Sequence, residues 1–205
     1  MPQAQSLVVL DRDGVINADS DAFIKSPQEW VALPGSLEAI VSLKKAGFQV
    51  AIATNQSGLK RGYYDRATFY AMQQKLHAQL AALAPDACVD WVSFSPYLNA
   101  DASPARKPNI GMLQAIQLAC RTPLVGQWFI GDALSDLQAA RRAQMQPILL
   151  KSGKGQRTLT QASAATPWLD QVPVFEDLAA AVARFLMLYP APGLVNTKEK
   201  EKCSV

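Results

Sequence analysis

Short apolar runs alternate with longer amphipathic segments through residues 7–150 of the chain. Five runs have the length and the aliphatic or aromatic content of buried strands: residues 7–10, 48–53, 89–94, 128–130 and 147–150. Between them, apolar residues recur at helical spacing in four segments, at about residues 37–45, 65–83, 109–120 and 134–144. Strands that alternate with helices form parallel sheets covered on both faces. The pattern therefore predicts a three-layer α/β fold with a Rossmann-like parallel sheet.

Polar and charged residues follow the predicted strands directly. Parallel sheets of this kind bind ligands beyond the carboxyl ends of their strands. The segments at those ends are Asp11-Arg12-Asp13-Gly14, Thr54-Asn55-Gln56-Ser57-Gly58, Arg106-Lys107-Pro108, and Gly131-Asp132 with Asp136 beyond it. We therefore expect a functional site at this edge of the sheet.

Asp11, Asp13 and Asp132 are candidate ligands of a metal ion. Residues two apart in an extended chain point to the same side, so the first strand presents Asp11 and Asp13 together. If Asp132 arrives from a neighbouring strand, hard oxygen ligands converge on one point. Mg²⁺ prefers such an environment, with water and a substrate phosphate completing its octahedron. The pattern predicts a Mg²⁺ site.

Lys107, Arg106 and Thr54 add positive charge and a hydroxyl donor to these carboxylates. A carboxylate that approaches a phosphate dianion at ~4 Å is repelled by about 8 kcal/mol at an effective dielectric constant of about 20. Mg²⁺ and Lys107 can offset that repulsion and stabilise the equatorial oxygens of the transition state. Asp11 then stays ionised as the nucleophile, whereas a negative leaving group is expected to raise the pKa of Asp13, which serves as general acid and then as general base. The residues predict a phosphatase that forms an aspartyl phosphate.

Each segment alone has a simpler interpretation. Asp-x-Asp-Gly, Thr-Asn and Gly-Asp are common in turns, and Arg-Lys-Pro is common at solvated helix starts. Their joint occurrence after successive strands favours catalysis. Lys151, Gly153, Lys154 and Gly155 follow the last predicted strand, but their glycine spacing fits no phosphate-binding loop, so we interpret them as a turn.

Composition limits the remaining possibilities. The chain has 205 residues, of which 49% are hydrophobic, enough for one core without disulfides or structural metals. Its net charge of +3 comes without a basic cluster, so we expect a small-molecule partner and no nucleic acid. No apolar run approaches the ~20 residues of a membrane span, and the N-terminus has no signal-peptide pattern. We expect a cytoplasmic, monomeric protein without a membrane partner.

A single domain is expected over residues 1–189. Residues 190–205 are polar, contain proline and lack a core pattern, and we expect them to form a disordered tail. Cys88, Cys120 and Cys203 show neither metal-binding nor disulfide spacing and are expected to be free thiols.

The four strand-end segments resemble, in order and in spacing, the motifs of the haloacid dehalogenase-like phosphatase superfamily over about residues 7–150. Further residues are similar to the branch that contains histidinol phosphatases and heptose bisphosphate phosphatases: Arg12, Asn17, Gln56-Ser57-Gly58, Arg61-Gly62, Pro108 and Gly111-Met112. A third set is most similar to the heptose bisphosphate phosphatases: Asp19 to Ala22, Lys25-Ser26-Pro27, Trp30, Leu33-Pro34-Gly35-Ser36 and Asp136-Leu137-Gln138-Ala139-Ala140.

The resemblance implies a role for each motif residue. It implies that Asp11 is the nucleophile and that Asp13 is the general acid and base. Mg²⁺ would be held by the Asp11 carboxylate, the Asp13 main-chain carbonyl and Asp132, while Thr54 and Lys107 would stabilise the phosphoryl group. The residues implied to bind the substrate are Asp19, Ser20, Asp21, Ala22, Asn55, Gln56, Ser57 and Arg106.

The resemblance also implies a substrate class. Heptose bisphosphate phosphatases remove the 7-phosphate of a phosphosugar, the heptose 1,7-bisphosphate, on the route to lipopolysaccharide. Because no insertion is large enough for a separate cap domain, an open site is expected. Histidinol phosphate or a broader range of sugar phosphates remains an alternative, since the catalytic motifs are shared. A non-catalytic phosphosugar-binding protein is a third interpretation.

One loop departs from the branch. Its members commonly carry a structural zinc before the Arg-Lys-Pro motif, with Cys-x-His followed by Cys-x-Cys. In an ungapped alignment the four ligand positions hold Ser95, Tyr97, Ser103 and Ala105, none of which is a plausible zinc ligand. We predict that the chain binds no zinc. Two alternatives remain for the loop: it is held by Pro96, Pro104, Pro108 and packing of Tyr97, or it is more mobile than in the branch.

Overall fold

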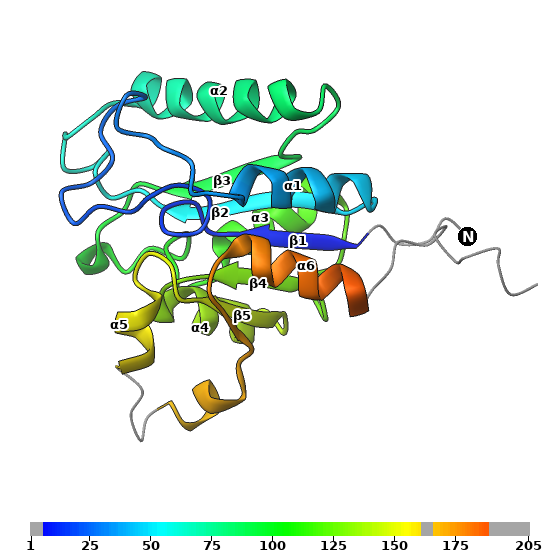
Figure 1. The fold of residues 1–205 in the computed structure, drawn as a ribbon. Helices are drawn as coiled ribbons and strands as arrows, with labels where there is room; N and C mark the ends of the chain where they lie inside the picture. The colour runs from blue at the N-terminus through cyan, green and yellow to red at the C-terminus, as the bar shows by residue number, and fades with distance from the viewer. Residues whose placement is uncertain (1–5, 161–165, 189–205) are drawn as a thin grey trace, which may run out of the picture.

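Six parallel strands form a single sheet in the order β3-β2-β1-β4-β5-β6 (Figure 1). The computed structural model describes residues 6–160 and 166–188, so the predicted tail at 190–205 and Cys203 lie outside the described residues. The strands are β1 (Leu7–Leu10), β2 (Gln49–Asn55), β3 (Trp91–Ser95), β4 (Trp128–Gly131), β5 (Gln146–Leu150) and β6 (Val174–Phe175).

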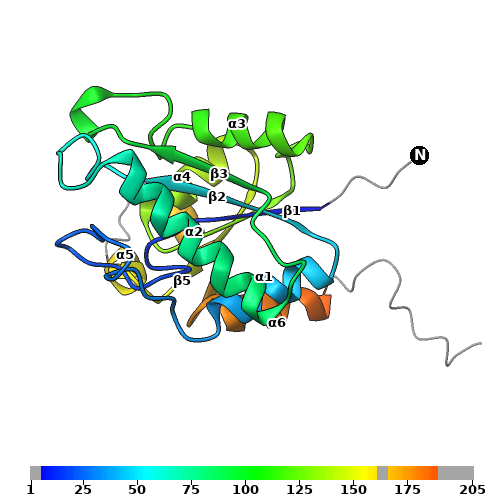
Figure 2. The same ribbon diagram turned by 90° about the horizontal axis from the view of Figure 1, so that it is seen from above.

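Helices cover both faces of the sheet (Figure 2). They are α1 (Ser36–Lys45), α2 (Arg66–Leu83), α3 (Gly111–Cys120), α4 (Leu134–Arg142), α5 (Gly155–Thr160) and α6 (Leu178–Leu188), with the 3-10 helices η1 (Asn99–Asp101) and η2 (Pro167–Gln171). Helices α1, α2 and α6 pack on one face, and α3 and α4 pack on the other. The predicted three-layer α/β architecture is therefore confirmed.

The two cores use alternate residues of the central strand β1. Val8 and Leu10 face the cluster under α1, α2 and α6, whereas Leu7 and Val9 face the cluster under α3 and α4. A strand sends successive side chains to opposite faces. Because all four side chains are buried, a slip of one residue would exchange the two faces, so the register that places Asp11 at the end of β1 is strongly specified.

Most predicted elements up to residue 150 appear within two residues of their expected bounds. Helix α2 begins after Asp65, whose carboxylate accepts a hydrogen bond from the Thr68 N–H at 2.8 Å and caps the helix. Strand β2 continues two residues beyond its predicted end and carries Thr54 and Asn55 to the edge of the sheet. The prediction includes none of the elements after residue 150. Strand β6 and helix α5 are too short to show a period, whereas α6 has buried residues at helical spacing and is missed.

The loops at the carboxyl edge carry the candidate residues. Residues 11–35 connect β1 to α1 and fold back on themselves through isolated bridges that join Asp13 to Asn17 and Asn17 to Ala32. This loop and the loops after β2 and β3 gather with α5 at one end of the sheet (Figure 1). None of the described connections there forms a separate folded unit.

No helix among residues 6–160 and 166–188 combines the length and the apolar character needed to cross a bilayer.

Candidate active site

A cavity of about 310 Å³ lies at the carboxyl ends of the strands. Of the sequence-predicted site residues, all except the exposed Ala22 line it: Asp11, Asp13, Asp19, Ser20, Asp21, Thr54, Asn55, Gln56, Ser57, Arg106, Lys107 and Asp132. Six further residues line it that sequence reasoning did not single out for the site: Phe23, Ile24, Tyr64, Ala133, Ser135 and Lys154. Segments far apart in the sequence meet here because parallel strands end at one edge.

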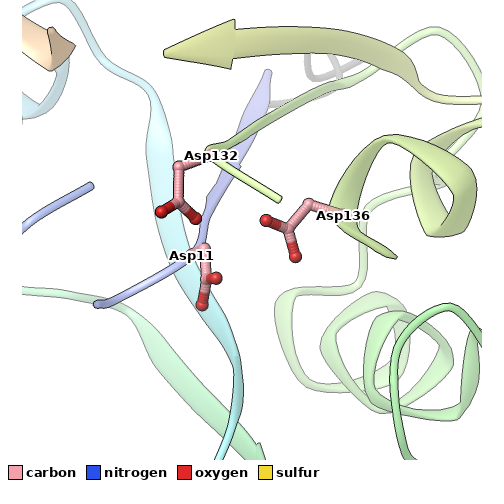
Figure 3. Close-up of side chains that lie close together, drawn as sticks. All are labelled: Asp11, Asp132 and Asp136. Carbon is pink, nitrogen blue, oxygen red and sulfur yellow. The ribbon is translucent and has the colours of Figure 1, made fainter. Parts of the chain in front are cut away.

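Three carboxylates converge at the inner end of the cavity. Asp11 follows β1, Asp132 follows β4 and Asp136 lies in the first turn of α4, and each offers an oxygen within 4.8 Å of the others (Figure 3). Burial raises the pKa of Asp11 and of Asp132, and the neighbouring carboxylates raise both further. A buried cluster of hard oxygens fits a divalent cation such as Mg²⁺, which would hold these groups in their ionised form.

Asp136 belongs to this cluster although sequence reasoning assigned it no role in the site. Its other oxygen accepts a hydrogen bond from the Ala133 N–H at 3.0 Å, which caps the start of α4. That hydrogen bond, to Oδ2, orients a side chain that is only 1% exposed. The remaining oxygen of Asp136, Oδ1, lies 2.7 Å from the Lys107 ammonium. The sequence signal that could have identified Asp136 is a second aspartate four residues after Asp132, in the first turn of the following helix.

Lys107 is the buried cation of the site. Its ammonium lies 2.9 Å from Asp11 Oδ1 and 2.7 Å from Asp136 Oδ1, and it donates to the Ala53 carbonyl at 2.7 Å. Burial alone would lower the pKa of Lys107, but the two carboxylates outweigh it and raise the pKa above its usual value. Lys107 is therefore a fixed positive charge beside Asp11.

Asn55, at the end of β2, also positions Lys107 through two hydrogen bonds to its main chain. Asn55 accepts a hydrogen bond from the Lys107 N–H at 3.1 Å and donates to the Lys107 carbonyl at 3.2 Å. Although Asn55 lines the cavity as predicted, its amide is committed to this main-chain pair. Its structural contribution is to join the end of β2 to the loop that carries Lys107.

Asp13 is held as a carboxylate in the site without substrate. Its carboxylate accepts three hydrogen bonds from the buried Arg12 guanidinium, at 2.9–3.0 Å, and one each from Asn17 and Gln56, at 2.9 and 2.7 Å. Burial would raise the pKa of Asp13, but the Arg12 charge and these hydrogen bonds outweigh it and hold the pKa below its usual value. This low pKa belongs to the protein without substrate, where the adjacent arginine turns back onto Asp13; the rise predicted beside a negative leaving group stays a prediction.

Gln56 has an amide orientation determined by its partners. Its oxygen accepts from Arg12 and from the Tyr64 hydroxyl, so its nitrogen must be the atom that donates to Asp13 and, at 2.8 Å, to Thr54 Oγ1. Burial raises the pKa of Tyr64 to about 12, which keeps that hydroxyl a donor. Because Thr54 Oγ1 accepts here, its own hydrogen is left to donate into the cavity. Nothing in the sequence pattern marks Tyr64.

The loop after β3 is braced by Arg106. Its guanidinium donates to the Tyr97 carbonyl at 2.8 Å and to Asn99 Oδ1 at 2.7 Å, within the loop itself. Asp101 accepts from the Leu98 N–H at 2.7 Å and pairs with Lys60 from the loop after β2. The expected packing of Tyr97 is wrong, because its side chain is 41% exposed and its backbone makes the contact instead.

The four positions aligned with zinc ligands offer no Cys or His, and their side chains do not suit a structural zinc site. The Ser95 hydroxyl is buried, and no hydrogen-bond partner is found for it among the described residues. The hydrogen bonds and ion pair around Arg106 and Asp101 supply the cross-links of this loop.

The loop at residues 19–24 forms the outer wall of the cavity and faces the segment after β5. Asp19 pairs there with Lys154 at 2.8 Å, and the Lys154 N–H donates to Asp132 at 2.6 Å. Residues 151–154 form the expected turn, which leads into α5, but Lys154 within this turn also lines the cavity. Its signal would have been the lysine between two glycines, Gly153 and Gly155, in the turn after a strand.

Comparisons with known proteins agree with this geometry. A family model described as polynucleotide kinase 3 phosphatase matches residues 7–151. The chain is 47% identical over 181 residues to D-glycero-β-D-manno-heptose-1,7-bisphosphate 7-phosphatase of Pseudomonas putida, covering 88% of this chain and 99% of that protein.

Two solved structures share the fold. The D,D-heptose 1,7-bisphosphate phosphatase of Bordetella bronchiseptica, complexed with magnesium and phosphate, superposes with a TM-score of 0.83 at 44% identity, covering 90% of this chain and 99% of that one. The enzyme of that name from Burkholderia thailandensis has a TM-score of 0.67 at 39% identity, covering 89% and 99%. With its carboxylates, lysine and strand-end motifs in this arrangement, the chain belongs to the heptose bisphosphate phosphatase family of haloacid dehalogenase-like hydrolases.

Proposed function

We propose that this chain hydrolyses the 7-phosphate of D-glycero-β-D-manno-heptose 1,7-bisphosphate with the help of Mg²⁺. The supporting observation is the buried Asp11, paired with Lys107 at 2.9 Å beside two further carboxylates, in a chain 47% identical to an enzyme of that activity. The reaction is the hydrolysis of a phosphoric monoester. It would place the chain in carbohydrate metabolism, at a step that supplies precursors of lipopolysaccharide.

We propose that the carboxylates of Asp11 and Asp132 and the main-chain carbonyl of Asp13 hold the magnesium ion, with Asp136 close by. Once bound, Mg²⁺ supplies positive charge that offsets the repulsion between a carboxylate and a phosphate. The Bordetella bronchiseptica enzyme contains magnesium and phosphate, which supports this assignment. Zinc is not part of the proposal, because the four positions aligned with its ligands carry the wrong side chains.

In the first step, an oxygen of Asp11 attacks the phosphorus atom. Lys107 and the Arg12 N–H both contact Oδ1 of Asp11, at 2.9 and 2.7 Å, which leaves Oδ2 as the attacking atom. The bond between phosphorus and the sugar oxygen breaks, and Asp13 gives a proton to the departing alkoxide. Lys107 and the Thr54 hydroxyl stabilise the equatorial oxygens. The product is an aspartyl phosphate.

In the second step, water replaces Asp11 on phosphorus. Asp13, now a carboxylate, takes a proton from the water as it attacks, and Asp11 leaves with its electron pair. In the free site the pKa of Asp13 lies below its usual value, so the group is ionised and able to accept a proton. For the first step we propose that the dianionic phosphate raises the Asp13 pKa on arrival, since a nearby like charge favours the protonated form.

The substrate-facing wall is proposed to comprise Asp19, Ser20, Asp21 and Ala22 on one side, with Asn55, Gln56, Ser57 and Arg106 on the other. Seven of these eight residues line the cavity. Asn55 and Gln56 have amides committed to other residues, so they act by shaping the wall and placing Lys107 and Asp13. Arg106 would supply charge for the phosphate that is not cleaved.

We further propose a single domain over residues 1–189 that works as a monomer in the cytoplasm. The described cysteines, Cys88 and Cys120, are free thiols, which suits a reducing compartment. Light scattering of the purified protein would test the monomer.

The test is phosphate release from the heptose bisphosphate with Mg²⁺, beside an EDTA control, histidinol phosphate and fructose 1,6-bisphosphate. Fast release from the heptose alone that EDTA abolishes is the expected result. The variant Asp11→Asn should fold but lose turnover. Equal or faster release from histidinol phosphate would move the assignment to the other activity of the branch, and turnover by Asp11→Asn would contradict the covalent mechanism.

A further inference from the structure

Lys154 lies on a segment that none of the four motifs includes, yet this segment packs directly against the metal-site carboxylate Asp132. The Lys154 N–H donates to Asp132 Oδ2 at 2.6 Å, and the Thr158 hydroxyl donates to the Asp132 carbonyl at 2.8 Å. A Cβ atom at Gly153 would lie 2.1 Å from the same Oδ2, so only glycine allows this approach. The position of Lys154 is therefore defined relative to the site.

The side chain of Lys154 reaches across the cavity to the loop at residues 19–24. Its ammonium lies 2.8 Å from Asp19 Oδ2, and the Asp19 side chain is only 15% exposed. A second, exposed contact joins Arg157 to Asp21 at 3.5 Å. The loop thus meets the segment after β5 through Lys154 on the inside of the wall and through Arg157 on the outside.

Without Lys154, Asp19 would lose its paired cation in a cavity that also holds the carboxylates of Asp11 and Asp132. The Lys154 charge interacts with all three carboxylates, and most strongly with Asp19. Like charges in a partly buried site repel each other more than they do in water. The loop would then relieve the repulsion by moving outward, and the wall that borders the sugar would lose its place.

We propose that Lys154 is a positioning residue for substrate selectivity: through its ion pair with Asp19 it holds the loop at residues 19–24 in place as the outer wall of the cavity. The inference rests on the proposed function for the identity of the sugar, but the placement of the loop does not. It assigns Lys154 no contact with the phosphate that is cleaved.

The first experiment compares Lys154→Met with Lys151→Met, a matched control three residues away whose ammonium pairs with Glu176 outside the cavity. For the heptose bisphosphate we expect Lys154→Met to raise KM by about 10-fold with kcat within about 3-fold of the parent. For p-nitrophenyl phosphate, which has no sugar to border, both constants should stay within about 2-fold. Lys154→Arg should restore KM, and Lys151→Met should match the parent.

A double-mutant cycle separates positioning from direct contact. Asp19→Asn alone should raise KM, and the double variant Asp19→Asn, Lys154→Met should be no worse than the poorer single variant, because both remove the same pair. Additive losses would mean that Lys154 binds the substrate by itself and would overturn the proposal. A fall in kcat on both substrates would overturn it as well, since it would place Lys154 in the chemistry.

Amide hydrogen exchange tests the placement of the loop without any substrate. Residues 18–24 should exchange faster in Lys154→Met than in the parent or in Lys151→Met. Unchanged exchange would overturn the proposal whatever the substrate proves to be. If the parent fails to hydrolyse the heptose bisphosphate while exchange behaves as expected, the proposed function fails and the positioning role stands.

Discussion

Replacing Arg12 by methionine should destabilise the protein in a way that depends on pH. Arg12 is fully buried, its guanidinium makes three contacts with the Asp13 carboxylate at 2.9–3.0 Å, and it lies 5.4 Å from the centre of the Phe69 ring. Methionine fills much of the same space but leaves Asp13 without its cation. The perturbation therefore isolates the ion pair.

The expected loss of unfolding free energy depends on the hydrogen bonds that Asp13 retains in the variant. Removing one partner of a buried pair costs about 3–5 kcal/mol, because the other charge stays desolvated. Asp13 retains its hydrogen bonds from Asn17 and Gln56, and its side chain is 21% exposed, so about 3 kcal/mol is expected. For a chain of this size that loss lowers Tm by roughly 6–12 °C.

The shift in the pKa of Asp13 determines how the stability difference between variant and parent changes with pH. In the parent the folded-state pKa of Asp13 lies below its unfolded value, so its contribution is present at neutral pH and is lost as pH falls through the folded-state pKa. In Arg12→Met burial prevails and raises that pKa, so the folded variant gains stability by taking up a proton as pH falls. The difference in unfolding free energy between variant and parent should therefore shrink from about pH 7 to about pH 5.

The assay is denaturant unfolding of both proteins in EDTA at the two pH values. The double variant Arg12→Met, Asp13→Asn serves as the control, because it removes the orphaned charge and should recover part of the loss at neutral pH. A loss in Arg12→Met that is the same at both pH values and unchanged in the double variant would refute the reasoning. It would mean that packing of the Arg12 stem, and not its charge, is what the site requires.

Three further predictions concern neighbouring groups. Asp136→Asn should lower kcat by about 10²-fold, because Lys107 loses a carboxylate that positions its ammonium; parental kcat at saturating substrate and Mg²⁺ would contradict this. Tyr64→Phe should cost about 1 kcal/mol in denaturant unfolding, because the amide of Gln56 loses a buried donor, and unchanged stability would contradict it. Burial raises the pKa of Asp11 to about 7 and that of Asp132 to about 8, with further contributions from their carboxylate neighbours, so the metal-free protein should lose stability as pH rises toward these values. The increase in Tm on adding Mg²⁺ should accordingly be larger at about pH 8 than at about pH 6, and an increase that shrinks with rising pH would contradict it.

Tertiary structure decided which partners the site residues have. Asp13 and Arg12 are neighbours in sequence, but only the folded loop turns the guanidinium back onto the carboxylate and lowers its pKa. Lys154 meets Asp19 across the cavity, and Tyr64 meets Gln56 from the segment before α2. These contacts depend on side-chain directions and on loop paths, which no periodicity in the chain encodes.

The sequence by itself determined five of the six strands, the two covered faces of the sheet and the edge at which the site residues gather. Apolar runs and helical spacing predict the layers, and the rule that parallel strands end together places Asp11, Thr54, Lys107 and Asp132 at one site before any coordinate is known. The local pattern is sufficient to predict this edge, because buried strands that alternate with helices form a parallel sheet whose strands all end on the same side. Only the tertiary structure decided three features: the ionisation of Asp13, the orientation of the Asp136 carboxylate toward Lys107, and the contact of Lys154 with the loop at residues 19–24. Electrostatic and hydrogen-bond energies depend on distances between residues that only packing brings together.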